Sequence, residues 1–305
     1  MTSPIVVVGS VAFDSIKTPF KEVSRVVGGA ATYFSMSASF FTTVRVVAVV
    51  GEDFGQRQMK VFEGRAIDLE GLQRVPGETF RWKGEYGFDL NSRETIYTRL
   101  NVFDQFAPRL PASYLETPFV FLGNIQPQLQ LDVLNQVKAP KLVAADTMNY
   151  WIERTPAELG RVLERIQILI INDSEARELA REANLVKAAR RIKAMGPEVL
   201  VIKRGEHGVL MSRDGDGLFA APAMPLEEVL DPTGAGDTFA GGFMGYLASS
   251  GEVTDATLGR AIIYGSTMAS FAVEDFGLSR LLTLDAEQVH ERFRAFKTLT
   301  HFDEV

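Results

Sequence analysis

The most constraining feature of this 305-residue chain is the run Asp231-Pro-Thr-Gly-Ala-Gly-Asp237-Thr-Phe-Ala-Gly-Gly-Phe243. Asp-Pro predicts a turn, and the Gly-Ala-Gly that follows leaves the backbone open to a ligand. From Asp237 onward, apolar residues recur at helical spacing. A glycine-rich turn that leads into a helix presents unpaired N–H groups at the positive end of the helix dipole. The pattern therefore predicts a helix whose start binds an anion, and the length of the chain with its 46% hydrophobic content allows one large α/β domain or two smaller ones.

Asp237 suggests what this anion site does. A carboxylate is a poor phosphate ligand, but it can take a proton from a hydroxyl that attacks phosphorus. A solvated aspartate has a pKa of about 3.9, so we expect an ionised base at pH 7. A simple capped helix explains an isolated Gly-Ala-Gly-Asp equally well. Gly241, Gly242 and Gly245 each cost the following helix about 1 kcal/mol relative to alanine, which predicts that something approaches it closely.

Two other nucleotide-binding motifs are excluded. The run is not a P-loop, because the chain contains no Gly-Lys pair, and Phe239 replaces the third glycine of a dinucleotide fingerprint. A formal net charge of -7 argues against a nucleic-acid partner. The chain has no cysteine and only three histidines, which excludes thiolate metal sites and fits a reducing compartment. Without a basic leader or an apolar run of membrane length, we expect a cytoplasmic protein that does not contact membranes.

Short apolar runs predict the strands of a parallel sheet. We expect these strands at residues 4–8, 44–50, 119–122, 142–145, 168–171 and 199–202. Helices are expected from about residue 30 to 41, from 237, over 254–273, and over 285–305 as a charged amphipathic helix. Residues 79–101 break this rhythm and predict two strands around a turn at 89–92.

Polar residues at strand ends are candidate ligand contacts, because ligands of parallel sheets gather beyond the carboxyl ends of the strands. Asp14 follows the first strand and is placed to bind substrate hydroxyls, although a loop aspartate is the simpler interpretation. Gly28 and Gly29 precede a helix and permit either close ligand approach or a tight turn. Asn172 and Glu175 fit a capping box as well as a binding site.

Together these motifs resemble the PfkB (ribokinase-like) carbohydrate kinase family, in the family's order and over essentially the whole chain. The resemblance implies one domain over residues 1–305, an α/β three-layer sandwich with a mostly parallel central sheet. It also implies a small β lid contributed by roughly 14–27 and 79–103. The implied reaction moves the γ-phosphoryl group of ATP to a primary hydroxyl of a sugar such as ribose. A nucleoside kinase and a non-catalytic sensor are the alternatives, and the intact Asp237 disfavours the sensor.

The resemblance also implies residue roles. Asp237 is the catalytic base, with Gly234, Ala235 and Gly236 stabilising the developing charge. The acceptor contacts are Asp14, Gly28, Gly29, Ala30 and Gln126. The nucleotide contacts are Asn172, Lys203, Gly205 and Gly208, while Glu175 positions Mg²⁺. Asp231 and Thr233 resemble a monovalent-cation site that would take K⁺.

Further expectations concern the lid and the nucleobase. The turn Gly51-Glu-Asp53-Phe-Gly55 is assigned a structural role, and residues 254–277 should wall the adenine pocket. The lid aromatics are compatible with three interpretations. They could stack on the base of a nucleoside acceptor, pack on the main domain as part of a solvent-facing hairpin, or be buried in a homodimer contact through the lid. A phosphorylated acceptor would require cations near Asp14, for which Lys17, Arg25, Arg81 and Lys83 are the candidates.

Overall fold

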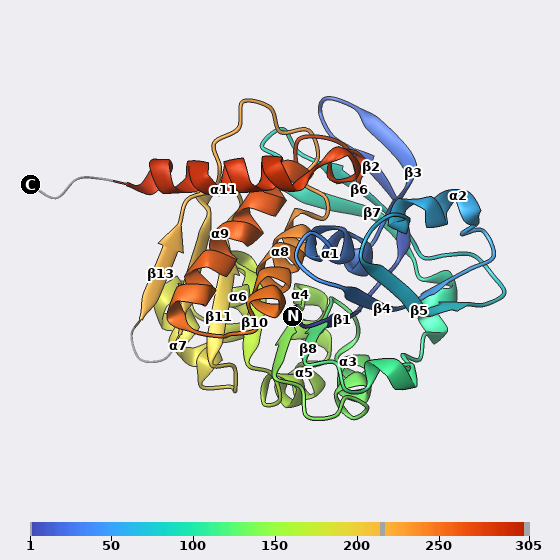
Figure 1. Ribbon diagram of the computed structural model, residues 1–305, viewed down its shortest axis with the longest axis horizontal. Coiled ribbons are helices and arrows are strands. Elements are labelled where there is room, and N and C mark those ends of the chain that lie inside the picture. Colours follow the sequence, from blue (N-terminus) through green and yellow to red (C-terminus); the bar gives the residue numbers. More distant parts are fainter. Residues whose placement is uncertain (1, 214–216, 302–305) are drawn as a thin grey trace, which may run out of the picture.

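The structure is a computed structural model that describes residues 2–213 and 217–301. Its centre is a nine-stranded sheet in the order β13-β12-β11-β10-β9-β8-β1-β4-β5 (Figure 1). The strands are β1 (Ile5–Val8), β4 (Val44–Val50), β5 (Ile67–Arg74), β8 (Phe119–Leu122), β9 (Leu142–Ala145), β10 (Ile168–Asn172), β11 (Val199–Lys203), β12 (Val209–Ser212) and β13 (Leu218–Ala221). All six predicted central strands are present. The pairings from β11 to β5 are parallel, whereas β12 pairs antiparallel with both β11 and β13.

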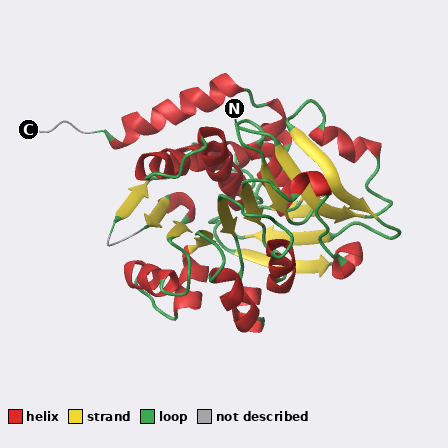
Figure 2. Ribbon diagram, turned by 60° about the horizontal axis from the view of Figure 1, so that its bottom comes forward, coloured by secondary structure: helices red, strands yellow, loops and turns green. Residues whose placement is uncertain are grey.

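Helices cover both faces of this sheet, which confirms the predicted three-layer sandwich (Figure 2). On one face lie α1 (Ala30–Ala38), α8 (Ala235–Ser250) and α9 (Asp255–Ala272), with α10 (Ser279–Thr283) and α11 (Ala286–Thr300) outside them. On the other lie α3 (Pro127–Leu134), α4 (Asn149–Arg154), α5 (Pro156–Leu163), α6 (Asp173–Ala180) and α7 (Leu185–Lys193). A short helix, α2 (Gln56–Met59), follows β4. Residues 302–305 of the predicted last helix lie outside the described residues.

Alternation along β1 divides the core between the two helical layers. Ile5 and Val7 pack in the cluster that contains Phe239 of α8. Val6 and Val8 pack in the cluster that contains Leu131 and Ala176 of the opposite layer. A strand buried on both faces requires apolar residues at every position, and this explains the continuous apolar runs in the sequence.

The glycines of α8 let neighbouring helices approach closely. A Cβ atom on Gly241 would lie 2.3 Å from the carbonyl oxygen of Phe34 in α1, and one on Gly242 would lie 2.9 Å from that of Tyr264 in α9. The close approach that these glycines predict is therefore helix packing. It fixes the axis of α8 and so the direction in which its N-terminus points.

A second, four-stranded sheet has the order β3-β2-β6-β7 and lies beside the carboxyl end of β1. We call this sheet the lid; it consists of β2 (Ala12–Lys17), β3 (Glu22–Gly28), β6 (Arg81–Tyr86) and β7 (Arg93–Arg99). Two antiparallel pairs are joined by the parallel pairing of β2 with β6. The two strands predicted around residues 89–92 are β6 and β7.

Asp53 anchors the lid to the central domain. Its carboxylate accepts hydrogen bonds from the backbone N–H and the hydroxyl of Thr79, at 2.8 and 2.6 Å. It also forms ion pairs with Arg25 and Arg81 of the lid, both at 3.1 Å. The turn at residues 51–55 thus has a structural role, because Asp53 holds β3, β6 and the residues just before β6 together.

Among the described helices, none combines the length and apolar composition of a membrane span.

Candidate active site

The N-terminus of α8 forms the centre of the candidate site. The helix begins at Ala235, two residues earlier than predicted, and Gly234 caps it with φ 74°, a left-handed conformation that favours glycine. A Cβ atom on Gly234 would lie 2.4 Å from the ring of Tyr33. The N–H of Ala235 donates to the carbonyl of Pro232 at 3.2 Å, whereas those of Gly236 and Asp237 have no acceptor within the described residues. Unpaired amides at a helix start can bind an anion.

Asp237 lies in the first turn of α8 and is half-buried. Burial and the neighbouring Asp146 raise its pKa to about 7, against the opposing effects of Lys203 and Arg93. The ordinary carboxyl pKa expected from the sequence is therefore wrong, because that value assumes full solvation. A carboxyl group with a pKa near neutrality is well matched to proton transfer.

Asp14 lies on β2 and is only 4% exposed. Burial raises its pKa to about 7, with Asp231 and Asp237 adding to the effect and the hydrogen bond from the Gly29 N–H opposing it. A Cβ atom on Gly28 would lie 1.9 Å from the Asp14 Oδ2 atom, so this position admits only glycine. The predicted acceptor residues Asp14, Gly28 and Gly29 are therefore in mutual contact.

Ala30 completes this corner through its backbone. Its N–H donates to the Ser10 hydroxyl at 3.0 Å, which ties the start of α1 to the loop after β1. Gly29 has φ 94°, and a Cβ atom there would lie 2.5 Å from the Ser10 carbonyl oxygen. The backbone of Gly29 and Ala30 is thus fixed by Ser10.

A buried charge cluster lies beside the α8 N-terminus. Lys203 Nζ is 3.7 Å from Asp146 Oδ2, and a Cβ atom on Gly236 would lie 2.9 Å from the same Nζ. Burial alone would lower the pKa of Lys203, but Asp146, Glu175 and Asp237 outweigh it and raise the pKa. Lys203 therefore stays charged beneath the anion-binding amides.

Glu175 faces the same cluster. Burial and Asp146 raise its pKa to about 7. It also closes a capping box with Asn172, in which each side chain accepts from the other residue's N–H at 2.8 Å. The capping interpretation of these residues is confirmed, and their role in the site stays a prediction. Asp146 was not among the predicted site residues, although its position directly after β9 was a usable signal.

Asp231 and Thr233 form a bonded loop before α8. The Asp231 carboxylate accepts from the N–H of Thr233 at 2.9 Å and from the N–H of Gly277 at 3.0 Å. The Thr233 hydroxyl donates to the Tyr86 hydroxyl of the lid at 3.0 Å. Asp231 is 1% exposed, so these bonds satisfy a buried carboxylate.

Three predicted site residues stand apart from this cluster. Gly208 has φ 79°, and a Cβ atom there would lie 2.1 Å from the carbonyl oxygen of Ala221, which gives it a packing role. Gly205, with φ 55°, lies under the lid turn, because a Cβ atom there would be 3.0 Å from Asn91 Oδ1. Gln126 is exposed at the N-cap of α3, and its side chain forms no hydrogen bond within the described residues.

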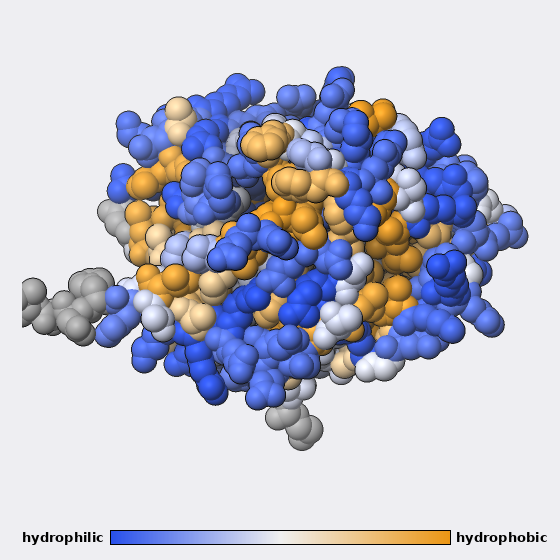
Figure 3. Space-filling view, turned by 90° about the horizontal axis from the view of Figure 1, so that it is seen from above, coloured by the Kyte–Doolittle hydropathy of each residue, from blue (hydrophilic) through white to orange (hydrophobic). Residues whose placement is uncertain are grey.

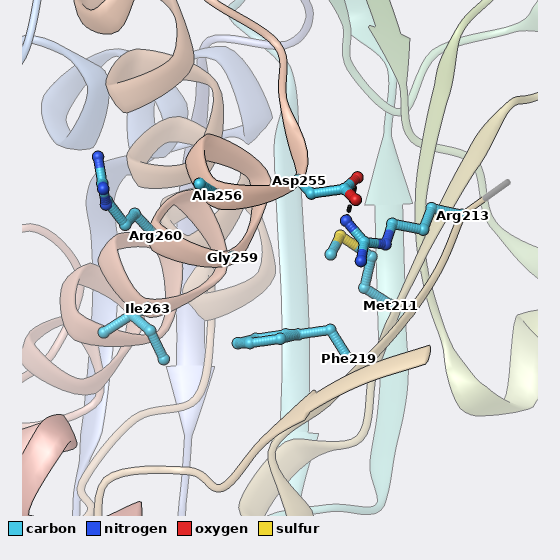
Figure 4. A pocket seen from close by; sticks show the side chains of 8 residues that line it. All are labelled: Met211, Arg213, Phe219, Asp255, Ala256, Gly259, Arg260 and Ile263. Atoms are coloured by element: carbon cyan, nitrogen blue, oxygen red, sulfur yellow. Dashed lines mark ion pairs between the residues drawn. The ribbon is translucent and has the colours of Figure 1, made fainter. Parts of the chain in front are cut away.

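A cavity of about 340 Å³ lies elsewhere, between the β12–β13 hairpin and the first half of α9 (Figure 4). Met211, Phe219 and Gly259 line it, and an Arg213–Asp255 ion pair lies at its edge. The turn at residues 274–277 follows the opposite end of α9, a helix of 18 residues and therefore about 27 Å long. Of the two predicted walls of the adenine pocket, α9 lines this cavity and the turn at residues 274–277 does not.

The donors present fit a nucleotide-bound magnesium ion. Among the described residues, no group of three or more His, Cys, Asp or Glu side chains could hold a metal alone. Mg²⁺ commonly binds through one or two carboxylates together with substrate phosphates and water. Burial raises the pKa values of both Asp146 and Glu175, and the charge of Asp146 adds to the rise at Glu175. A nearby cation would favour the ionised forms of both carboxyl groups.

Comparisons with known proteins identify the family and the fold. Residues 3–284 match the family described as pfkB family carbohydrate kinase. The chain is 31% identical over 248 residues to a cytidine kinase of Thermococcus kodakarensis, covering 79% of this chain and 87% of that one. It is 26% identical to a nucleoside kinase of Methanothermobacter thermautotrophicus, covering 95% and 96%. The fold resembles that of Arabidopsis thaliana ribokinase complexed with ribose and ATP, with TM-score 0.78, 20% identity and coverage of 96% and 99%.

Proposed function

We propose, from the premise that this chain belongs to the pfkB family of carbohydrate kinases, that it phosphorylates the primary hydroxyl of a ribosyl group, with a ribonucleoside as acceptor. The chain is a phosphotransferase that uses ATP and an alcohol acceptor of the sugar or nucleoside class. One observation carries the residue assignment. A half-buried carboxylate, Asp237, shares the first turn of α8 with unpaired amides and interacts electrostatically with Asp14 and Lys203.

The mechanism follows from these charges. Asp14 holds the acceptor hydroxyls, and Gly28 leaves room for its carboxylate. Asp237 takes the proton from the attacking primary hydroxyl as the oxygen approaches the γ-phosphorus. The N–H groups of Gly236 and Asp237 stabilise the charge that develops on the transferred group. Lys203 adds a fixed positive charge beside them, and this combination of positioning and electrostatics is how phosphoryl transfer is catalysed.

Magnesium would enter beside the nucleotide phosphates. When bound, Mg²⁺ neutralises phosphate charge and orients the γ-phosphoryl group. Asp146 and Glu175 would hold it, directly or through water, while Asn172 keeps Glu175 in place. Lys203 is the last residue of β11, and Gly205 and Gly208 lie in the turn that follows it. All three would lie near the nucleotide phosphates.

A ribonucleoside acceptor is favoured over a phosphorylated sugar. A cytidine kinase and a nucleoside kinase align over 79% and 95% of this chain, whereas a 2-dehydro-3-deoxygluconokinase of Escherichia coli aligns over 70%. The four cations considered for an acceptor phosphate each have a carboxylate partner: Lys17 with Glu85, Lys83 with Glu22, and Arg25 and Arg81 with Asp53. None of them is available as a dedicated phosphate ligand without breaking an ion pair.

The deciding experiment is an acceptor screen with Mg²⁺ and ATP. Ribonucleosides, ribose and other free sugars, and sugar phosphates are compared by acceptor-dependent ADP formation. We expect the largest kcat/KM with a ribonucleoside. Activity confined to sugar phosphates would reject the acceptor assignment, and the absence of acceptor-dependent ADP formation would favour a sensor.

Two further proposals concern K⁺ and assembly. A K⁺ ion near Asp231 and Thr233 would stiffen the loop before α8, and kcat in K⁺ should then exceed kcat in tetramethylammonium at constant ionic strength.

The lid carries the exposed apolar residues Phe88 and Ile96, and apolar groups separated by hydrophilic ones are visible on the face seen from above (Figure 3). A homodimer through the lid would cover such groups, and light scattering tests it.

A further inference from the structure

Strand pairing gives the lid two distinct faces. Asp14 pairs with Trp82, and Tyr86 pairs with Arg93, so these four side chains lie on one face. This inner face also contains Ile16, which clusters with Tyr86 and with Phe276 of the central domain. A register shift in β7 between the partners of Lys83 and Gly84 turns Tyr97 and Arg99 to the outer face.

The lid holds Arg93 in place. Its guanidinium lies over the Trp82 ring at 5.3 Å from the centroid and interacts with the Tyr86 hydroxyl. The indole itself is fixed, since its Nε1 donates to the Thr95 hydroxyl at 3.3 Å. A Cβ atom on Gly84 would lie 2.1 Å from the Trp82 ring, so glycine is needed for the indole to fold across the sheet.

Arg93 and Arg99 differ from the other four cations of the lid strands, because neither forms an ion pair with a described residue, and of these two only Arg93 lies on the inner face. Ion pairs neutralise Lys17 and Lys83 on the outer face and Arg25 and Arg81 at the base. Arg93 is exposed and forms no ion pair with any described residue. Its charge favours the ionised forms of Asp14, Asp237 and Glu175 and so opposes the rise in their pKa values, and these three residues come from separate elements. Its position is therefore central to the site.

We infer that Arg93 is a catalytic residue supplied by the lid, whose guanidinium contacts the γ-phosphoryl group as it moves between ATP and the acceptor. This inference rests on the proposed function. The space between Asp14, which binds the acceptor, and Asp237, which receives its proton, is where that group must pass. A planar guanidinium offers several N–H donors to phosphate oxygens. Because Tyr86 also accepts a bond from Thr233, Arg93 takes this position only when the lid reaches the loop before α8.

The test compares Arg93→Gln and Arg93→Lys with Arg99→Gln, a matched control on the outer face of the same strand. Removing a cation that stabilises the transferred group should lower kcat by about 10²–10³-fold, with the KM values for ATP and acceptor within a few fold. Lysine should restore part of the loss, because it keeps the charge without the planar donors. Arg99→Gln should retain the wild-type kcat.

Binding measurements separate catalysis from structure. Arg93→Gln should lose affinity for magnesium, ADP and aluminium fluoride in the presence of acceptor, while retaining its melting temperature and its affinity for ATP. A normal kcat in Arg93→Gln would overturn the inference, as would a loss confined to the acceptor KM, which would make Arg93 an acceptor ligand. A wild-type protein without kinase activity would instead refute the proposed function itself.

Discussion

The hydroxyl of Thr233 donates a 3.0 Å hydrogen bond to the phenol oxygen of Tyr86. Thr233 belongs to the loop before α8, and Tyr86 is the last residue of lid strand β6. Both side chains are buried, at 9% and 8% exposure, so this bond is shielded from water. It joins the lid to the loop that leads into the unpaired amides of α8, where we propose that phosphate binds. The positions of the lid and of this loop are therefore coupled.

We predict that Tyr86→Phe lowers kcat by about fivefold, because a buried hydrogen bond of this kind contributes about 1 kcal/mol and its loss leaves the Thr233 hydroxyl unpaired. The KM for ATP should change by less than about threefold. Steady-state kinetics measures both values. Tyr97→Phe is the matched control, since Tyr97 lies on the outer face of the lid. An unchanged kcat in Tyr86→Phe would show that the bond does not assist catalysis.

We predict that Asp237→Asn lowers kcat by about 10²–10⁴-fold while ATP affinity stays within a few fold. The pH dependence follows from the pKa of about 7 that burial gives Asp237. A base must be ionised to accept a proton, so wild-type kcat/KM should fall as the pH drops through about 7. The residual kcat of the variant at saturating acceptor should lack this acidic limb, whereas its kcat/KM still depends on the ionisation of Asp14, whose pKa is also about 7. A pH-independent wild-type rate between pH 6 and 8 would contradict the assignment.

Asp14→Asn should weaken acceptor binding by at least about 100-fold, because each hydrogen bond from a ligand to a carboxylate contributes about 1.5–3 kcal/mol. ATP binding should change little. Isothermal titration with each ligand separately measures the two effects. Equal losses for both ligands would indicate that Asp14 is structural.

The same substitution should make the protein more stable at pH 8. The folded pKa of Asp14 is raised from 3.8 to about 7, so the folded state binds more protons than the unfolded state between these values. Stability from this group therefore falls as the pH rises through that window. Asparagine carries no charge, and we expect Asp14→Asn to gain about 1–3 kcal/mol at pH 8 and much less at pH 4. Urea unfolding at both pH values checks the difference.

Helix packing gives a prediction independent of catalysis. Gly241→Ala should destabilise the fold by about 1–3 kcal/mol or more, because its Cβ would meet the backbone carbonyl of Phe34 at 2.3 Å. Gly160 is the control, since it lies in α5 with nothing within 4 Å of an added Cβ. Gly160→Ala should stabilise by up to about 1 kcal/mol. Similar unfolding midpoints for the two variants would contradict the packing account.

The sequence predicted the parts of this protein in which pattern and structure are local. Runs of four to seven apolar residues identified the buried strands, and the run from 231 to 243 placed the helix that presents Asp237. It did not identify β5, which is mostly half-buried, or the β12–β13 hairpin at the sheet edge. Strands with partly exposed faces lack the continuous apolar signal of the centre.

The site was harder to predict where it depends on the tertiary fold. The contacts of Asp146 with Lys203 and of Tyr86 with Thr233 join residues 57 and 147 positions apart. No spacing rule links them. The pKa of Asp237 was mispredicted for the same reason, because its burial and its neighbour Asp146 exist only in the folded chain. The glycines of α8 signalled close packing, but the sequence did not reveal that the partners are helices.

The most direct test of the central claim is the ³¹P NMR spectrum of the product formed from Mg²⁺, ATP and a ribonucleoside such as cytidine. Transfer to the primary hydroxyl predicts a monophosphate signal split by two methylene protons, appearing in equal amount with ADP. Asp237→Asn should form it at least about 100 times more slowly. A phosphate signal split by a single proton, or no acceptor-dependent product from any ribosyl compound, would contradict the account.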